Sequence, residues 1–273
     1  MKRLLFLIGL VLVAGLATAG YAWAMPSASF HEMNGEVFDD WQVCRTRVFG
    51  DDGFYQASET TFRPVIAFES LGGKAGLAYS LGEQFVRKYP DEARRAEETF
   101  YFVRDRVKYT PDVDQFERDE FAQNADELAA TIDQEGVGYG DCEDSAVLLA
   151  VMYKGAGYRS AIALAPGHTA ALVHLPGYKK ATAVFELDGE AGWVWAEATG
   201  SNNPLGWIPK ELANRKLAAY EITEEDIVAT KPTKAPAVAT TATGGGGGTS
   251  NTPFSFIGII GFLWLMSLFR RRR

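Results

Sequence analysis

Cysteine, histidine and clustered basic residues are scarce in this chain of 273 residues, which contains only two cysteines and three histidines. Two cysteines exclude a disulfide framework in a domain of about 200 residues and leave one bond, between Cys44 and Cys142, as an option. A formal net charge of -8 without a basic patch argues against nucleic acid as a partner. An internal repeat and a glycine-rich phosphate loop are also absent from the sequence. The 47% hydrophobic and 23% charged residues fit a globular protein.

The first 25 residues combine a basic start with an apolar run. Lys2 and Arg3 precede apolar and small residues that end in Ala-Trp-Ala, a sequence that fits a signal-peptidase site. At about 20 residues the run is also long enough to stay in the membrane. Residues 1–25 are therefore predicted to be a signal peptide or a signal anchor, and both interpretations imply export.

The C-terminal part has the composition of a linker followed by a membrane segment. Residues 229–252 are rich in Thr, Ala, Pro and Gly, which is typical of a flexible linker. In residues 253–273 an apolar run ends at Phe269 and precedes an arginine cluster, and the run is just long enough to span about 30 Å of hydrocarbon. The segment predicts a plain transmembrane anchor. It also resembles the C-terminal sorting signals of prokaryotic surface proteins, whose apolar helix is removed by a sorting protease.

The positive-inside rule orients both ends of the chain. Lys2 and Arg3 at one end, and Arg270 to Arg273 at the other, are expected in the cytoplasm. Residues 25–250 are then expected on the extracytoplasmic side of the cell membrane. The membrane is a predicted partner, and a sorting protease that acts on the tail is a second one.

The exported part begins with a strand-rich region. Residues 26–75 contain stretches of Val, Trp, Phe and Tyr around turn residues, which predicts an N-terminal extension of strands. Residues 76–228 are expected to form the main domain.

The main domain is predicted to begin with helices and to end with strands. Ala96, Phe100, Val103 and Val107 recur at helical spacing, and Asn124 fits a helix N-cap. After about residue 158 the apolar period changes to two, which predicts three or four antiparallel strands separated by Pro-Gly, Asp-Gly and Gly turns. Helices followed by a meander of strands indicate the α+β class.

The stretch GYGDCEDSAVLLAVMYKGAGY, residues 138–158, places Cys142 at the start of a predicted helix. Asp141 fits the N-cap and Asp144 the reciprocal position of a capping box. The positive end of a helix favours a thiolate in the first turn, whereas the carboxylates of Asp141, Glu143 and Asp144 disfavour it. Cys142 therefore needs a cationic partner to act as a nucleophile.

The three histidines are not equally suited to be that partner. His31 lies near the processed N-terminus. His168 and His174 have the same parity on one predicted strand, but they lie about 20 Å apart, so only one of them can reach Cys142. His168 follows a Pro-Gly pair at the start of the strand and is the better candidate, whereas His174 fits an edge histidine at the far end.

Glu197 is the candidate for the acid that orients the imidazole. It follows Trp193 and Trp195 on the same face of a predicted strand, at a place where a charge is otherwise unwelcome. Plain structural interpretations stay open at this stage: Cys142 as a buried thiol and Glu197 as a solvated strand end. A further interpretation makes Cys142, His168 and Glu197 three zinc ligands.

The combination GDCEDSAVLLAVMYKGAGY, PGHTAALVHL and WVWAEATG resembles the core of the transglutaminase-like superfamily, over roughly residues 80 to 210. The form DCED…GH…AEAT is especially similar to exported transglutaminase-like domains of archaea and bacteria. The resemblance implies a papain-like fold in which a Cys-bearing helix packs on an antiparallel sheet. It further implies Cys142 as nucleophile, His168 as general base and Glu197 as orienting acid, with no cofactor and no metal.

The function that follows from this resemblance is a membrane-tethered cysteine protease or amidase that forms a thioester with a peptide or protein substrate. The Cys142 amide and, as a guess, Tyr139 are expected to hold the oxyanion. Hydrolysis is favoured over transamidation because it needs only solvent. The alternative is a non-catalytic transglutaminase-like module for binding or assembly at the cell surface. For the catalytic interpretation, Cys44 is expected to be a free thiol distant from Cys142.

Overall fold

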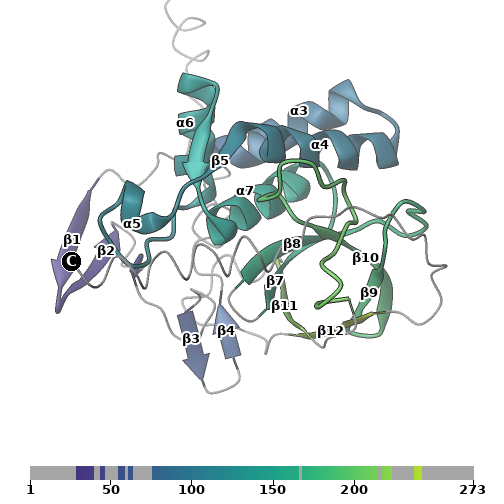
Figure 1. The fold of residues 1–273 in the computed structure, drawn as a ribbon. Helices are drawn as coiled ribbons and strands as arrows, with labels where there is room; N and C mark the ends of the chain where they lie inside the picture. Colours follow the sequence, from purple (N-terminus) through teal and green to yellow (C-terminus); the bar gives the residue numbers. More distant parts are fainter. Residues whose placement is uncertain are drawn as a thin grey trace, which may run out of the picture.

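The computed structural model describes residues 29–39, 44–46, 55–58, 61–63, 76–165, 168–213, 217–222 and 237–241 (Figure 1). The predicted membrane segments, residues 1–25 and 253–273, lie outside these ranges. Within the ranges, no helix has the length and apolar character needed to cross a bilayer.

Helix α7, which carries Cys142 at its first position, is the central helix of the domain. Three helices pack against it, and a short helix and two short strands lie near its N-terminus. The bounds are α3 (Leu77–Lys88), α4 (Glu92–Arg106), β5 (Val107–Tyr109), α5 (Asp112–Gln115), α6 (Ala125–Glu135), β6 (Gly138–Gly140) and α7 (Cys142–Gly155).

Helices α4 and α6 begin and pack largely as the sequence predicts, but Val107, which was expected on the helical face, follows the end of α4 and begins β5. Ala96, Phe100 and Val103 of α4 are fully buried. Asn124 caps α6 with a complete capping box, because its side chain accepts the amide of Glu127 and Glu127 accepts the amide of Asn124, both at 2.9 Å. The apolar pattern of α4 and the capping box of α6 therefore define these two helices through residues that are close in the sequence.

Helix α7 is buried on nearly all sides, unlike an amphipathic surface helix. Its backbone lies directly against α3, since a Cβ atom on Gly155 would lie 2.0 Å from the carbonyl oxygen of Tyr79. A glycine is therefore required at this crossing, and the close packing fixes the axis along which Cys142 is presented.

The strands after α7 form a closed, entirely antiparallel barrel in the order β10-β8-β7-β11-β12-β9. The bounds are β7 (Ser160–Ala165), β8 (His168–His174), β9 (Val184–Leu187), β10 (Glu190–Ala196), β11 (Leu217–Glu221) and β12 (Ala237–Thr241). The predicted antiparallel strands are thus present, but they are six and not three or four, and they do not form the predicted meander, because β8 pairs with β10 and not with β9. The sheet curls until its edges meet, which leaves no unpaired edge in the barrel.

Two buried clusters separate the inside of the barrel from its helix-covered face. Leu172, Trp193 and Trp195 belong to the inner cluster, whereas Val173 and Val194, one residue away on the same strands, pack with the helices. Helix α7 contacts β7 and β8 on that outer face. Mixed helices and a curled antiparallel sheet make the domain α+β, with the Cys-bearing helix packed on the sheet.

The region before the helices contains strands, as predicted. Two hairpins are described, β1 (Phe30–Met33) with β2 (Glu36–Asp39) and β3 (Tyr55–Ser58) with β4 (Thr61–Arg63). The prediction of a flexible linker at residues 229–252 is wrong for part of that range, because Ala237–Thr241 form β12. This segment pairs with β9 and β11, whose edges would otherwise be open.

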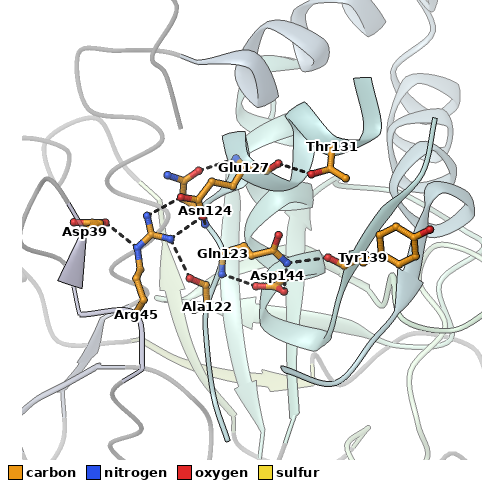
Figure 2. Close-up of polar contacts among 9 residues, drawn as sticks. All are labelled: Asp39, Arg45, Ala122, Gln123, Asn124, Glu127, Thr131, Tyr139 and Asp144. Carbon is orange, nitrogen blue, oxygen red and sulfur yellow. Dashed lines mark hydrogen bonds and ion pairs between the residues drawn. The ribbon is translucent and has the colours of Figure 1, made fainter. Parts of the chain in front are cut away.

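A buried arginine joins the N-terminal region to the helices (Figure 2). Arg45 forms ion pairs with Asp39 and Glu127, both at 2.8 Å, and donates to the carbonyl oxygen of Ala122 at 3.0 Å. The Ala122 amide in turn donates to the Arg45 carbonyl at 2.9 Å. Arg45 thereby holds the segment before α6 from one side, and the next residue of that segment, Gln123, reaches the Cys142 helix.

Candidate active site

Cys142 is held at the N-terminus of α7 by contacts that reach across the fold. Asp144 is 1% exposed and accepts three hydrogen bonds: from the Gln123 amide at 2.7 Å, from Gln123 Nε2 at 2.6 Å and from the Asp141 amide at 3.4 Å. Gln123 Nε2 also donates to the carbonyl oxygen of Tyr139 at 2.8 Å (Figure 2). Gln123 thus clamps both sides of the turn that presents the thiol.

This clamp requires a glycine in the turn. A Cβ atom on Gly140 would lie 2.6 Å from Asp144 Oδ2 and 3.0 Å from Gln123 Nε2. The Gly-Asp-Cys sequence therefore has a steric cause, since only glycine leaves room for the carboxylate and the amide beside the backbone.

A parallel pair of short strands brings a tyrosine to the same turn. In the pairing of β5 with β6, Tyr109 lies opposite Gly140, two residues before the cysteine. The pKa of the Tyr109 phenol is raised well above its ordinary value by its partial removal from water and by the negative charges of Cys142, Asp141 and Glu143. The phenol therefore stays protonated near neutral pH, although 45% of Tyr109 is exposed.

His168 and Glu197 are in direct contact. His168 is the first residue of β8 and Glu197 follows the last residue of β10, and the two strands pair side by side. His168 Nε2 lies within hydrogen-bond distance of Glu197 Oε2, and both side chains are buried, with exposures of 5% and 1%. The predicted pair is thus brought together at the rim of the barrel.

Glu197 is further fixed by the residues that follow it. Its Oε1 accepts the Thr199 amide at 3.1 Å and the Thr199 hydroxyl, and its carbonyl oxygen accepts Asn203 Nδ2. Burial by itself raises the pKa of Glu197, but the His168 imidazole and the Thr199 hydrogen bonds outweigh it and leave the pKa below its ordinary value. Glu197 is therefore a carboxylate near neutral pH and can stabilise an imidazolium.

Cys142 lies against the start of the same strand. The backbone N–H of Thr169, the residue after His168, donates to the Cys142 sulfur. The thiol itself donates to Glu143 Oε2 at 3.2 Å. Burial and the carboxylates of Glu143 and Asp141 raise the pKa of Cys142 well above its ordinary value, and the Thr169 hydrogen bond opposes this only in part. In this arrangement the thiol, not the thiolate, is favoured.

The other histidines and the second cysteine lie elsewhere. His174 is at the far end of β8, where its Nε2 lies 3.1 Å from the Ala191 carbonyl and 3.4 Å from Glu190. His31 stacks on Phe38 in the N-terminal hairpin. The prediction of a free Cys44 is confirmed, because both cysteines are free thiols and Cys44 donates to Glu36 at 3.3 Å.

Two other expectations change with the geometry. The zinc interpretation lacks support, because Cys142, His168 and Glu197 do not form a cluster of ligand atoms within 4.8 Å among the described residues. Tyr139 was the guessed oxyanion donor, but Tyr109 is the tyrosine that interacts electrostatically with Cys142. Sequence reasoning missed Tyr109 because only the parallel pairing of β5 with β6 brings it to the site.

Gln123 and Thr199 were also missed. Gln123 lies 19 residues before Cys142 in the chain, and no local pattern separates it from a surface glutamine. For Thr199 the sequence did contain a signal, since a hydroxyl two residues after a strand-end carboxylate can donate a hydrogen bond to that carboxylate.

A cysteine at a helix N-terminus and a buried histidine–carboxylate pair at the start of the neighbouring strand are features that cysteine-dependent acyl-transfer sites share. Residues 79–212, just under half of the chain, match the family model described as the transglutaminase-like superfamily. Members of this superfamily are often cysteine-dependent enzymes. No curated protein and no solved structure matched the chain.

Proposed function

We propose that the chain is an exported, membrane-tethered cysteine hydrolase that cleaves an amide bond in a peptide or protein substrate, with Cys142, His168 and Glu197 as its triad. The observation that carries the proposal is the buried contact of His168 with Glu197, next to the strand residue whose amide donates to the Cys142 sulfur. Burial of a histidine and a carboxylate costs free energy, because both groups lose water. We therefore take the buried pair as a sign of function rather than of stability.

The proton moves between Cys142 and His168. Nε2 of His168 is directed to Glu197, so Nδ1 is the nitrogen that takes the thiol proton. The sulfur then attacks the carbonyl carbon, and a C–S bond forms. The imidazolium gives its proton to the leaving amine as the C–N bond breaks, which leaves a thioester. Water, deprotonated by His168, attacks the thioester; the C–S bond breaks and Cys142 is restored.

The developing oxyanion has two donors in this scheme. The Cys142 backbone N–H is in the first turn of α7, where amides have no partner within the helix. The Tyr109 hydroxyl is the second donor and replaces the earlier guess of Tyr139, because it is the phenol beside the thiol and stays protonated.

Hydrolysis is proposed over transamidation, since water is the only acceptor that the scheme requires. Export and orientation follow from the sequence of the two ends, with the domain on the extracytoplasmic side of the membrane. A sorting protease that cleaves the tail is a proposed partner, and the substrate is proposed to be a peptide or protein at the cell surface.

Alkylation of the full-length chain with iodoacetamide, followed by peptide mass spectrometry, tests the proposal. Cys142 is expected to react faster than Cys44, although burial and nearby carboxylates favour its thiol form, because His168 takes the thiol proton in the proposed mechanism. Cys44 serves as an internal control, since it also forms no disulfide and donates to a carboxylate. An amide-hydrolysis assay on a peptide library should lose all activity with Cys142→Ala. Slow alkylation of Cys142 together with an inactive wild-type chain would favour the non-catalytic binding or assembly module.

A further inference from the structure

The described N-terminal residues 29–39 and 44–46 lie before the range 79–212 that matches the family model, yet they contact the loop that precedes α6. Phe30 of β1 lies against Phe121, with 5.7 Å between the ring centroids. Arg45 exchanges two hydrogen bonds with Ala122, one from its side chain and one to its backbone carbonyl. Two consecutive loop residues thus have partners in the N-terminal region.

The guanidinium of Arg45 holds three groups at once. It lies 2.8 Å from Asp39 through Nε, donates to the Ala122 carbonyl oxygen at 3.0 Å through Nη1, and meets both oxygens of Glu127 at 2.8 and 3.1 Å (Figure 2). Arg45 is only 2% exposed. A buried ion pair is weak evidence for stability, because its desolvation is costly, whereas a planar fork fixes several acceptors in one geometry. The network therefore indicates that the geometry of this loop matters.

The carbonyl group that Arg45 binds belongs to the same peptide unit as the amide that binds Asp144. The Ala122 carbonyl oxygen accepts from Arg45, and the Gln123 N–H donates to Asp144 Oδ1 at 2.7 Å. This peptide bond is trans, so its oxygen and its hydrogen point in opposite directions from one rigid plane. Arg45 therefore orients the N–H that Asp144 accepts, and its positive charge polarises that N–H and strengthens the hydrogen bond.

Asp144 passes this restraint on to the cysteine. It is 1% exposed, occupies the reciprocal position of the α7 capping box and accepts the Asp141 amide at 3.4 Å. Cys142 lies between these two residues, at the first position of the helix. A rotation of the Ala122–Gln123 peptide would thus displace the turn that presents the sulfur.

We propose that Arg45 is a positioning residue of the active site, which sets the reactivity of Cys142 through the Ala122–Gln123 peptide and Asp144. The N-terminal region is then a working part of the enzyme. This inference rests on the proposed hydrolase, because it concerns the nucleophile of that reaction. Its structural step, from Arg45 to the turn before α7, does not depend on catalysis and can be measured in an inactive chain.

Hydrogen exchange of the full-length chain, followed by peptide mass spectrometry, measures this structural step. Arg45→Lys keeps the charge, but one ammonium group cannot hold Asp39, Glu127 and the Ala122 carbonyl together. The amides of residues 138–146 are therefore expected to exchange about fivefold faster, the equivalent of one lost hydrogen bond. Unchanged exchange in this segment would overturn the proposal, whether or not the chain is an enzyme.

Two further variants sharpen the exchange measurement. Arg118→Lys is the matched control, because Arg118 also joins the main domain to the N-terminal hairpin, through Glu32 at 3.0 Å, but both side chains are exposed. It should leave the exchange of residues 138–146 unchanged. Asp39→Asn weakens the network without removing the guanidinium and should give a smaller increase than Arg45→Lys. An equal increase in Arg118→Lys and Arg45→Lys would contradict the assignment.

Catalysis provides the second readout. Arg45→Lys should lower kcat of amide hydrolysis and slow alkylation of Cys142 by about tenfold or more, because a small displacement of a nucleophile is costly. KM should stay close to the wild-type value, since Arg45 is buried. Absolute rates are compared at a temperature below the Tm of each variant, because Cys44 is next to Arg45 and is no control here. A raised KM with unchanged kcat would contradict a positioning role.

The hydrolase and this inference can fail separately. An inactive wild-type chain whose residues 138–146 still respond to Arg45→Lys would overturn the hydrolase and support the coupling of Arg45 to the turn. An active wild type with the same kcat and the same exchange in Arg45→Lys would overturn the inference alone.

A double-mutant cycle separates positioning from a general loss of stability. Gln123→Ala removes a side-chain hydrogen bond to the same Asp144 carboxylate. If Arg45 acts through Asp144, the double variant of Arg45→Lys and Gln123→Ala should slow alkylation of Cys142 by clearly less than the product of the two single effects. Effects that multiply, as they do for independent sites, would contradict the route through Asp144.

Discussion

The site has two halves, the His168–Glu197 pair at the barrel rim and the acids near Cys142 at the start of α7. Glu197 and the acids Asp112, Glu143 and Asp144 are all buried, whereas Cys142 and Asp141 are half-buried, and the two halves differ in how their charges are compensated. At the barrel rim, Glu197 has an imidazole, a hydroxyl and an amide as partners, and its pKa is lowered. At the start of α7, the acids around Cys142 have mostly one another, and the pKa values of Asp112 and Glu143 are raised. Burial therefore does not decide the state of a carboxylate; its partners do. The histidine half is therefore organised around charge compensation, whereas no ion pair among the described residues compensates the acids of the cysteine half.

The largest effect is expected for the histidine of the organised half. His168→Ala should slow alkylation of Cys142 and amide hydrolysis by about 10²-fold or more, because the thiol loses its base. Iodoacetamide kinetics and the peptide assay measure this. His174→Ala is the matched control, since His174 lies at the other end of the same strand and should leave both rates unchanged. If His174→Ala had the larger effect, the assignment of the base would be wrong.

The second prediction concerns the acid of that half. Glu197→Gln should keep the fold, because the amide is nearly the same size and can still accept from Thr199. It should slow alkylation near neutral pH about tenfold, since the imidazolium loses its negative partner. Glu186→Gln, at an exposed position of β9, is the control. Equal rates for Glu197→Gln and the wild type would reduce the triad to a dyad.

The third prediction tests the clamp that holds the cysteine half. Gln123→Ala removes two hydrogen bonds of its side chain and leaves the buried Asp144 with fewer donors, which should cost about 1–3 kcal/mol of unfolding free energy. Urea unfolding of variant and wild type measures the loss. Thr131→Ala, at a half-buried position of α6 where the hydroxyl donates only to the Glu127 carbonyl, should cost less than half as much. An unchanged stability of Gln123→Ala would mean that Asp144 does not need this clamp.

The smallest effect is expected at Asp126, another buried acid, whose carboxylate accepts one backbone amide and forms no ion pair among the described residues. Asp126 accepts the Ala78 amide at 2.9 Å, and burial raises its pKa from 3.8 to about 6. A raised pKa means that the stability contribution of the protonated acid is present below about pH 4 and is lost as the pH rises through about 6. Asp126→Asn should remove this pH dependence from thermal unfolding measured between pH 4 and 7. An identical slope in variant and wild type would contradict the raised pKa.

Much of the local structure could be read from the sequence, because its causes are local. The cap at Asn124, the apolar face of α4, the helix that begins at Cys142 and the period-two strands after it all follow from neighbouring residues. The linker prediction failed at β12, because composition does not show that β9 and β11 each have an edge with which this segment can pair. The contact of His168 with Glu197 was anticipated through a motif, and its geometry came from the register of β8 with β10.

By itself the sequence determined the α+β class, the start of the Cys142 helix and the three residues proposed to carry the chemistry. Only the tertiary structure decided which residues complete the site. Tyr109 arrives through the parallel pairing of β5 with β6, and Gln123 arrives through a loop that Arg45 holds from its other side. The physical reason is that hydrogen bonding and charge act over a few ångströms, and the separation of two residues along a chain does not specify their distance in space.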